Sequence, residues 1–137
     1  MILVDTSVLM DYFKGIENEP VALFDWVLDN SILYGICDFV YQELLQGARS
    51  ETEFLKLKTY LETVPFYYLQ HQKESYEQAA FMNVRCRMGG TTIRSTIDLL
   101  IAQIALENDF YLLHNDKNFD HMKTVLTDLK ILKKPLG

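Results

Sequence analysis

Four acidic residues stand where carboxylates can gather and bind metal ions. Asp5 and Asp116 come after strand-like stretches, Glu43 lies on a helix that follows another, and Asp98 falls in the first turn of a helix. Two carboxylates about 5 Å apart repel by roughly 3 kcal/mol at an effective dielectric near 20, so four together need a cation. All-oxygen ligation suits Mg²⁺ or Mn²⁺, which activate water and stabilise charge on a scissile phosphate. The set therefore predicts phosphodiester hydrolysis.

Each acid also has an ordinary structural explanation. Asp5 is suited to capping the next helix, and Glu43 to facing solvent from a helix. Asp98 would complement a helix dipole, and Asp116 is typical of a turn. No single acid carries the hypothesis, which depends on whether all four meet.

Strand-like and helical segments alternate along the chain. The expected strands are Ile2–Val4, Ile32–Ile36, Pro65–Leu69, Phe110–Leu113 and a short one near Ile131–Leu132. The expected helices are Thr6–Phe13, one opened by Pro20, Phe39–Gln46, one after Ser50, Lys73–Met88, one capped by Ser95 or Thr96, and a weak one after the polar turn 114–118. This order predicts a three-layer α/β/α fold with a central, mainly parallel sheet. Ligands bind beyond the carboxyl ends of such strands, where we expect the acids.

Local patterns predict several helix ends and faces. Thr6 or Ser7 is expected near the start of the first helix, and Asp38 is expected to cap the third. The helix after Ser50 is expected to present an apolar face of Phe54, Leu57 and Leu61.

Composition is that of one globular domain over residues 1–137, with 49% hydrophobic and 23% charged residues. No apolar run approaches the ~20 residues that span a bilayer, and the N-terminus does not resemble a signal peptide. Cys37 and Cys86 are far apart and are expected to be buried reduced thiols of a cytoplasmic protein. The net charge of −6 argues against a simple basic nucleic-acid binder, but not against a nuclease with a metal site.

The sequence gives weaker evidence for other kinds of catalytic or binding site. His71, His114 and His121 lack the spacing of a zinc site, and the chain has no G-x-S-x-G, P-loop or G-x-G-x-x-G motif. Cys37 has no credible catalytic His. We expect Asp11 to be exposed and Asp120 to lie in a solvated turn.

Four motifs together resemble those of PIN-domain ribonucleases, and most closely the VapC-like toxins of bacterial and archaeal toxin–antitoxin pairs. They are Asp5-Thr6-Ser7, Tyr41–Gly47, Ile97–Ala102 and Leu112–Phe119, and they occur in the family's order and spacing. The resemblance covers nearly the whole chain. It implies a PIN-like fold and a Mg²⁺- or Mn²⁺-dependent endoribonuclease.

The resemblance also implies roles for the four acids. Asp5 and Asp98 would be the principal metal ligands, and Glu43 would bind the metal or position the attacking water. Asp116 would complete the site directly or through water. The number of metal ions stays open.

The family further implies partners. Its members cut tRNA or ribosomal RNA in single-stranded loops, typically form homodimers, and are held by a cognate antitoxin that often inserts an Arg into the acidic pocket. No membrane partner is expected. For this chain Arg85, Arg87, Arg94 and Lys117 are the proposed phosphate contacts, although a solvated charged face is as good an explanation. For Tyr12, Tyr41 and Phe119 we favour core packing over base stacking.

One position departs from the family pattern. Many members have Thr or Ser two residues before the fourth acid, where this chain has His114. An imidazole there either replaces the hydroxyl or points elsewhere. Ser7 is the nearest supporting hydroxyl for the metal ligands, and Thr6 is a weaker candidate.

Three alternatives remain open. The first is a non-toxin PIN nuclease of RNA maturation, or a structure-specific DNA nuclease. The second is a non-catalytic PIN-like RNA-binding module. The third, an aspartyl-phosphate phosphatase, is disfavoured because Ser7 stands where a D-x-D signature has its second acid.

Overall fold

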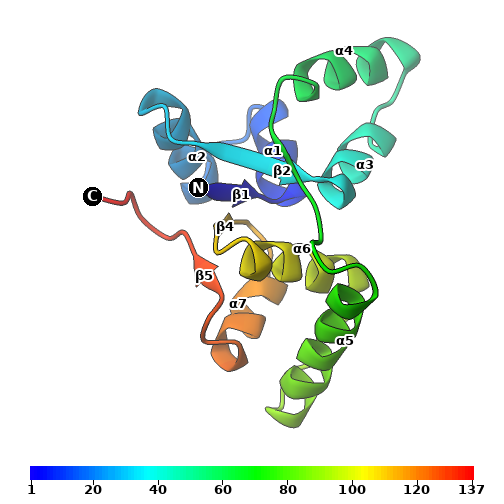
Figure 1. The fold of residues 1–137 in the computed structure, drawn as a ribbon. Coiled ribbons are helices and arrows are strands. Elements are labelled where there is room, and N and C mark those ends of the chain that lie inside the picture. Colours follow the sequence, from blue (N-terminus) through cyan, green and yellow to red (C-terminus); the bar gives the residue numbers. More distant parts are fainter.

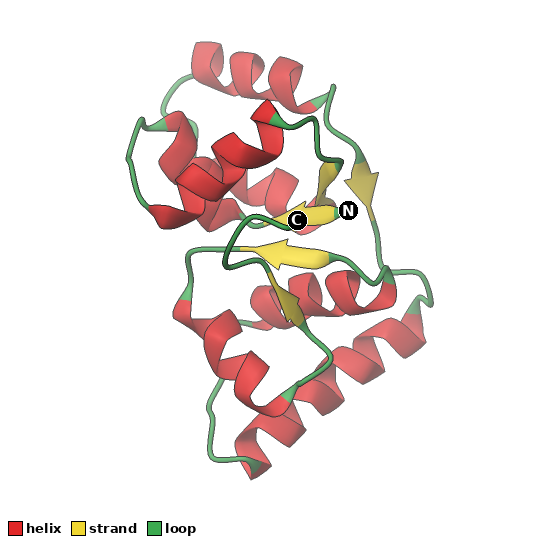
Figure 2. Cartoon of the chain, turned by 90° about the vertical axis from the view of Figure 1, so that its left-hand side faces the viewer, coloured by secondary structure: helices red, strands yellow, loops and turns green.

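All strands of the central sheet run parallel. The computed structural model describes residues 1–137, and its five strands lie in the order β3-β2-β1-β4-β5 (Figure 2). They are β1 Ile2–Val4, β2 Tyr34–Cys37, β3 Phe66–Tyr67, β4 Tyr111–Leu113 and β5 Lys130–Ile131. The chain moves outward from β1 to β3 and then returns to the other side of β1 with β4. The reversal between β1 and β4 is a topological switch point, where parallel sheets open a crevice at their carboxyl edge.

Helices cover both faces of the sheet. They are α1 Thr6–Phe13, α2 Glu19–Asp29, α3 Asp38–Gln46, α4 Glu51–Leu61, α5 Lys73–Met88, α6 Thr96–Glu107 and α7 Lys117–Val125. Helices α1 to α4 lie on one side, and α5 to α7 pack together on the other (Figure 1). This arrangement confirms the predicted three-layer α/β/α fold. No helix combines the length and the apolar character needed to cross a membrane.

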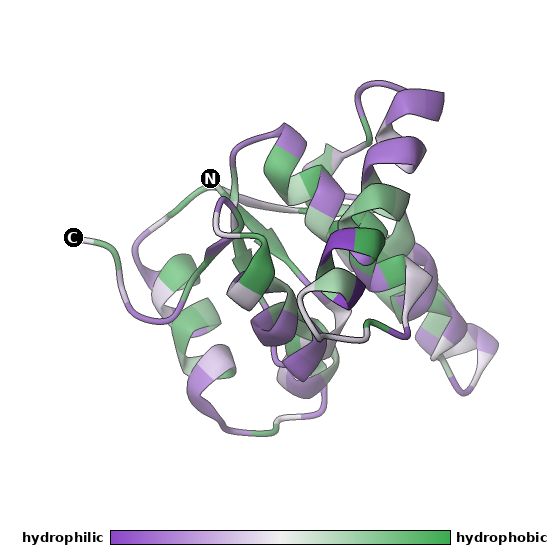
Figure 3. Cartoon of the chain, turned by 90° about the horizontal axis from the view of Figure 1, so that it is seen from below, coloured by the Kyte–Doolittle hydropathy of each residue, from purple (hydrophilic) through white to green (hydrophobic).

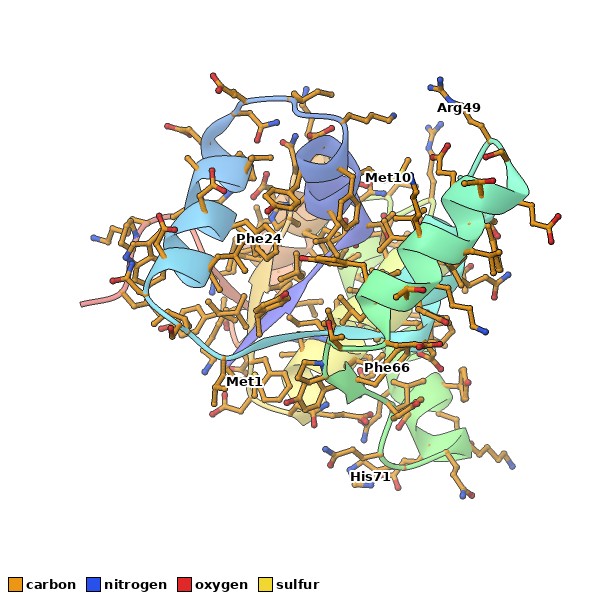
Figure 4. All side chains as sticks on the ribbon, turned by 90° about the horizontal axis from the view of Figure 1, so that it is seen from above. Met1, Met10, Phe24, Arg49, Phe66 and His71 are labelled. Carbon is orange, nitrogen blue, oxygen red and sulfur yellow. The ribbon has the colours of Figure 1, made fainter.

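The core is built around the short strand β1, whose three residues are fully buried. Phe24 extends from α2 into this region (Figure 4), where it packs edge-on against Tyr12 and Tyr34 at ring distances of 4.9 and 5.3 Å. Helix α6 is buried continuously over Asp98–Ala105, because it lies between the sheet, α5 and α7. Figure 3 shows the strands near the centre in hydrophobic colours and most surrounding loops in hydrophilic ones.

Several predicted boundaries were wrong by a few residues. Strand β2 begins at Tyr34 rather than Ile32, and Asp38 is the first residue of α3 instead of its N-cap. The N-cap is Cys37, which makes no side-chain capping bond, while the Asp38 carboxylate accepts only the adjacent Phe39 N–H at 3.1 Å. The expected polar turn is shorter than predicted, because α7 already begins at Lys117.

The predicted apolar face of α4 was also wrong. Of the three residues expected on its apolar face, only Leu61 is buried, and Phe54 is 37% exposed. The helix packs mainly against α3 rather than on the sheet. Its apolar pattern therefore remains largely open to solvent.

Candidate active site

Asp5 lies at the switch point, directly after β1, and is only 3% exposed. Its backbone N–H donates to Leu113 O on β4 at 2.9 Å, which fixes its position at the end of both strands. Its carboxylate caps α1, accepting the Ser7 N–H at 3.1 Å and the Ser7 hydroxyl at 2.6 Å. Burial raises the pKa of Asp5 to about 6; the Ser7 bonds oppose this rise, and repulsion from nearby carboxylates adds to it. Those carboxylates belong to Asp98 and Glu43.

Glu43 reaches the same place from α3. Its Oε1 accepts a 2.7 Å hydrogen bond from the Thr6 hydroxyl in the first turn of α1. This bond joins residues 37 positions apart and turns Glu43 toward Asp5. The other oxygen, Oε2, accepts no hydrogen bond from the protein.

Asp98 approaches from the start of α6. Ser95 caps this helix by accepting the Asp98 N–H at 3.2 Å, as predicted. The Asp98 carboxylate accepts the Asn118 side-chain amide at 2.9 Å. Burial raises the pKa of Asp98, repulsion from Asp116 and Glu43 adds to the rise, and the Asn118 bond opposes it.

Asp116 stands at the N-cap of α7, and Asn118 links it to Asp98. The Asn118 backbone N–H donates to Asp116 Oδ1 at 2.9 Å, while its side chain holds Asp98. One residue thus orients two acids from different elements. Asn118 was not among the predicted site residues, and its position two residues after Asp116 is its only signal in the sequence.

A second network fixes the loop between β4 and α7. The Ser7 hydroxyl accepts the Asn115 N–H at 2.9 Å while it donates to Asp5. Asp11, expected to be exposed, is partly buried and accepts the side-chain amides of Asn115 at 3.1 Å and Asn18 at 3.0 Å. The loop that carries Asp116 is therefore tied to α1 by two side chains.

The structural roles of the acids at helix ends are compatible with a chemical role. Asp5 is a helix N-cap, as its local sequence suggests, whereas Asp116, expected in a turn, is the N-cap of α7. The same caps lie next to Asp98 and Glu43, because the sheet brings the ends of β1 and β4 together. Two helix N-termini directed toward one place also favour negative charge there.

The donor set suits a hydrated divalent cation. No three side chains of His, Cys, Asp or Glu converge closely enough to enclose an ion by themselves. Mg²⁺ is commonly held by one or two carboxylates and keeps several of its waters. The carboxylate oxygens of the four acids fit that requirement better than they fit zinc, which prefers nitrogen and sulfur.

Several other polar candidates lie outside this cluster. Asp120 was expected in a solvated turn, but it lies on α7 and is partly buried, and its carboxylate accepts Lys133 Nζ at 2.8 Å. His114 is buried against Phe119, and burial lowers its pKa. Phe119 itself belongs to the core, as predicted. Cys37 and Cys86 are free and buried, as predicted, and burial raises the pKa of Cys37 to about 12.

The basic residues proposed for RNA binding are all exposed, and none forms an ion pair. Lys117 is next to Asp116, and Arg94 lies in the loop that leads to α6. Arg85 and Arg87 are in the last turn of α5, and Arg85 lines a cavity of about 800 Å³ together with several acids. Lys117 therefore adjoins Asp116, whereas Arg85 lines a cavity whose lining includes none of the four acids.

A family model of the PIN domain matches residues 2–125, which include all four acids. The chain belongs to the PIN-domain family. VapC ribonuclease Mb1587 of Mycobacterium bovis is 26% identical over 121 residues, covering 88% of this chain and 90% of that protein. Ribonuclease VapC11 of Mycobacterium tuberculosis matches with the same identity and coverage.

Solved structures share the fold. VapBC2 from Rickettsia felis, bound to a promoter DNA fragment, has a TM-score of 0.74 at 18% identity, over 96% of this chain and 98% of that one. VapBC-1 from nontypeable Haemophilus influenzae has a TM-score of 0.69 at 24% identity, over 97% and 98%. The PIN fold therefore extends over nearly the whole chain.

Proposed function

We propose that this PIN protein is a metal-dependent endoribonuclease and the toxin of a toxin–antitoxin pair. One observation carries the proposal: Asp5 and Asp98 are buried beside each other at the switch point, and Glu43 and Asp116 adjoin them. Burying ionised carboxylates together costs stability, so the arrangement points to chemistry. The ribonuclease relatives, which match 88% of the chain, support the same activity.

Each acid has a role in the proposed reaction. Asp5 and Asp98 would hold Mg²⁺ or Mn²⁺, and Asp116 would complete the site directly or through water. The cation would supply positive charge that makes water a better nucleophile and stabilises the scissile phosphate. Glu43 orients the attacking water and takes its proton on Oε2, while the Thr6 bond holds Oε1. Water adds to phosphorus as the bond to the leaving ribose oxygen breaks.

The proposed substrate is a single-stranded loop of tRNA or ribosomal RNA. Lys117 and Arg94 are exposed near Asp116 and Asp98 and are free of ion pairs, so they can contact phosphates on either side of the scissile bond. Arg85 and Arg87 would contact the RNA strand farther from the scissile bond. Local positive charge offsets the net charge of −6 where the strand must approach.

The proposed antitoxin binds the open apolar surface between α1, α3 and α4. A cavity of about 280 Å³ lies there, and its lining includes Met10, Leu44, Leu57 and Arg49. Figure 4 labels Met10 and Arg49. Leu44 and Glu43 both lie on α3, and we propose that a segment seated in this cavity extends an Arg toward the acids. The structural neighbours titled VapBC support a partner of this kind.

The proposed homodimer uses the outer face of α5. Phe81, Val84 and Met88 are exposed there at i, i+3 and i+7, and Phe81 is 61% exposed. The helix carries Glu74 in its first turn and Arg85 and Arg87 in its last. Two copies paired antiparallel about a twofold axis bring acidic and basic ends together around the apolar centre. We further propose that residues 1–137 act as a single PIN domain in the cytoplasm.

RNA cleavage tests the function. Purified protein is incubated with tRNA and ribosomal RNA in Mg²⁺ or Mn²⁺, beside Asp5→Asn, Asp98→Asn and the control Asp128→Asn, which changes an exposed acid outside the site. We expect the wild type and the control to cut at few positions and the two site variants not to cut. Equal cleavage by all four proteins contradicts the assignment.

Two further readouts separate the alternatives. Expression that arrests growth, and an arrest that Asp5→Asn relieves, supports the toxin over a nuclease of RNA maturation. Absence of both cleavage and divalent-metal binding in calorimetry would favour a non-catalytic RNA-binding module.

A further inference from the structure

His114 is the last residue before the loop that carries Asp116, and its ring is buried. The side chain packs on Phe119 at a ring distance of 5.0 Å, and the residue is 5% exposed. Its Nε2 is buried without a hydrogen-bond partner, 3.5 Å from Asp120 Oδ1. An imidazole enclosed in this way cannot reach RNA, so direct proton transfer to the substrate is excluded.

The other ring nitrogen of His114, Nδ1, accepts a hydrogen bond from the main chain. The backbone N–H of Asp116 donates to His114 Nδ1 at 3.0 Å. Because a main-chain N–H can only donate, Nδ1 carries no proton, and the proton of the neutral ring is on Nε2. A side-chain acceptor bound to the N–H two residues later is the geometry of Asx and Ser/Thr turns. In this chain an imidazole makes that turn.

The turn determines where Asp116 points. Asp116 is the N-cap of α7, and its carboxylate can accept the Asn118 N–H only if its backbone keeps the extended N-cap conformation. That conformation is held from one side by the His114 bond and from the other by the Asn115 N–H bond to Ser7. The His114 ring thus orients the Asp116 carboxylate through the backbone.

We propose that His114, as the neutral Nε2–H tautomer, is a positioning residue that fixes the Asp116 carboxylate for catalysis. The proposal rests on the proposed function, because only a nuclease needs Asp116 in this orientation. Asp120 and Lys133 keep the ring in place from its other edge, since Lys133 Nζ holds the Asp120 carboxylate at 2.8 Å beside Nε2.

A matched pair of amide variants tests the role. In His114→Asn the carboxamide oxygen can take the place of Nδ1 as a turn acceptor, whereas His114→Gln carries the same group one bond farther out. We expect His114→Gln to lower kcat for RNA cleavage ~10- to 100-fold with little change in KM, and His114→Asn to recover most of the loss. His121→Asn, an exposed histidine on α7, is the control.

Nitrogen NMR of the imidazole and amide exchange at Asp116 test the geometry without RNA. We expect the Nε2–H tautomer, and an Asp116 N–H that exchanges slowly in the wild type and His114→Asn but quickly in His114→Gln. A proton on Nδ1, or equal kcat for the two amide variants, overturns the proposal. If the wild type cuts no RNA, the proposed function fails, while the tautomer and the exchange rates still decide the local geometry.

Discussion

The Ser7 hydroxyl donates a 2.6 Å hydrogen bond to the Asp5 carboxylate, and the Ser7 N–H reaches the same oxygen at 3.1 Å. Both bonds favour the ionised carboxylate, which burial and the neighbouring acids disfavour. Ser7 therefore keeps Asp5 closer to its charged form. At these two residues a helix cap coincides with one of the proposed metal ligands.

Replacement of Ser7 tests this balance. Ser7→Ala removes one bond to Asp5 and the acceptor for the Asn115 N–H. We expect the pKa of Asp5 to rise above about 6, so that divalent-metal binding, followed by calorimetry across pH, begins at higher pH. Thr92→Ala removes an exposed loop hydroxyl and should leave the pH midpoint of metal binding unchanged. If Ser7→Ala has the same midpoint as the wild type, Ser7 does not have this role.

Stability without metal should depend on the protonation of Asp5. Its pKa is raised from 3.8 to about 6 on folding, so the native state binds more protons in this range. The contribution to stability is present below pH 4 and is lost as pH rises through 6, by about 3 kcal/mol. Asp5→Asn should therefore gain stability relative to the wild type from pH 4 to pH 7 in urea unfolding. A constant difference between the two proteins would contradict the burial of this charge.

Divalent metal should raise the melting temperature of the wild type. A ligand at one hundred times its Kd stabilises the folded state by about 2.7 kcal/mol. We expect Mg²⁺ or Mn²⁺ to shift the melting of the wild type and Asp128→Asn, and not that of a variant carrying both Asp5→Asn and Asp98→Asn. If millimolar metal leaves the wild-type curve unchanged, the acids do not form a metal site.

The Thr6 hydroxyl should matter for the chemical step. Thr6→Val keeps the shape of the side chain but removes the 2.7 Å bond to Glu43. We expect kcat to fall ~10- to 100-fold while KM changes little, because Glu43 loses its orientation. Thr6→Ser restores the donor and should restore kcat. Equal rates for the Val and Ser variants would show that the bond has no catalytic role.

A charge on α5 should dissociate the proposed dimer. Phe81→Glu places a carboxylate among the exposed apolar residues of α5, where burial against a second copy is unfavourable. Sedimentation should give a dimer for the wild type and a monomer for this variant. Leu33→Glu, at a residue 69% exposed before β2, is the matched control and should stay dimeric. A dimer that persists in Phe81→Glu places the interface elsewhere.

Local sequence determined the architecture and the edge of the sheet where the acids lie. Apolar runs predicted strands near the right places, and helices such as Lys73–Met88 were predicted to the residue. These features depend on periodicity and on residues at helix ends, which are properties of neighbours in sequence. The predictions of the N-cap at Asp38 and of the apolar face of α4 failed. At both places the local sequence allows more than one structure, and packing decides between them.

Only the tertiary structure decided how the acids are held. The bonds from Thr6 to Glu43, Asn118 to Asp98 and Asn115 to Ser7 join residues 37, 20 and 108 positions apart. These contacts exist because the order β3-β2-β1-β4-β5 places β2 and β4 on either side of β1, which no local pattern specifies. The sequence by itself therefore determined which residues could carry the chemistry. The strand order determined which of them meet, because it alone places residues distant in sequence at one edge of the sheet.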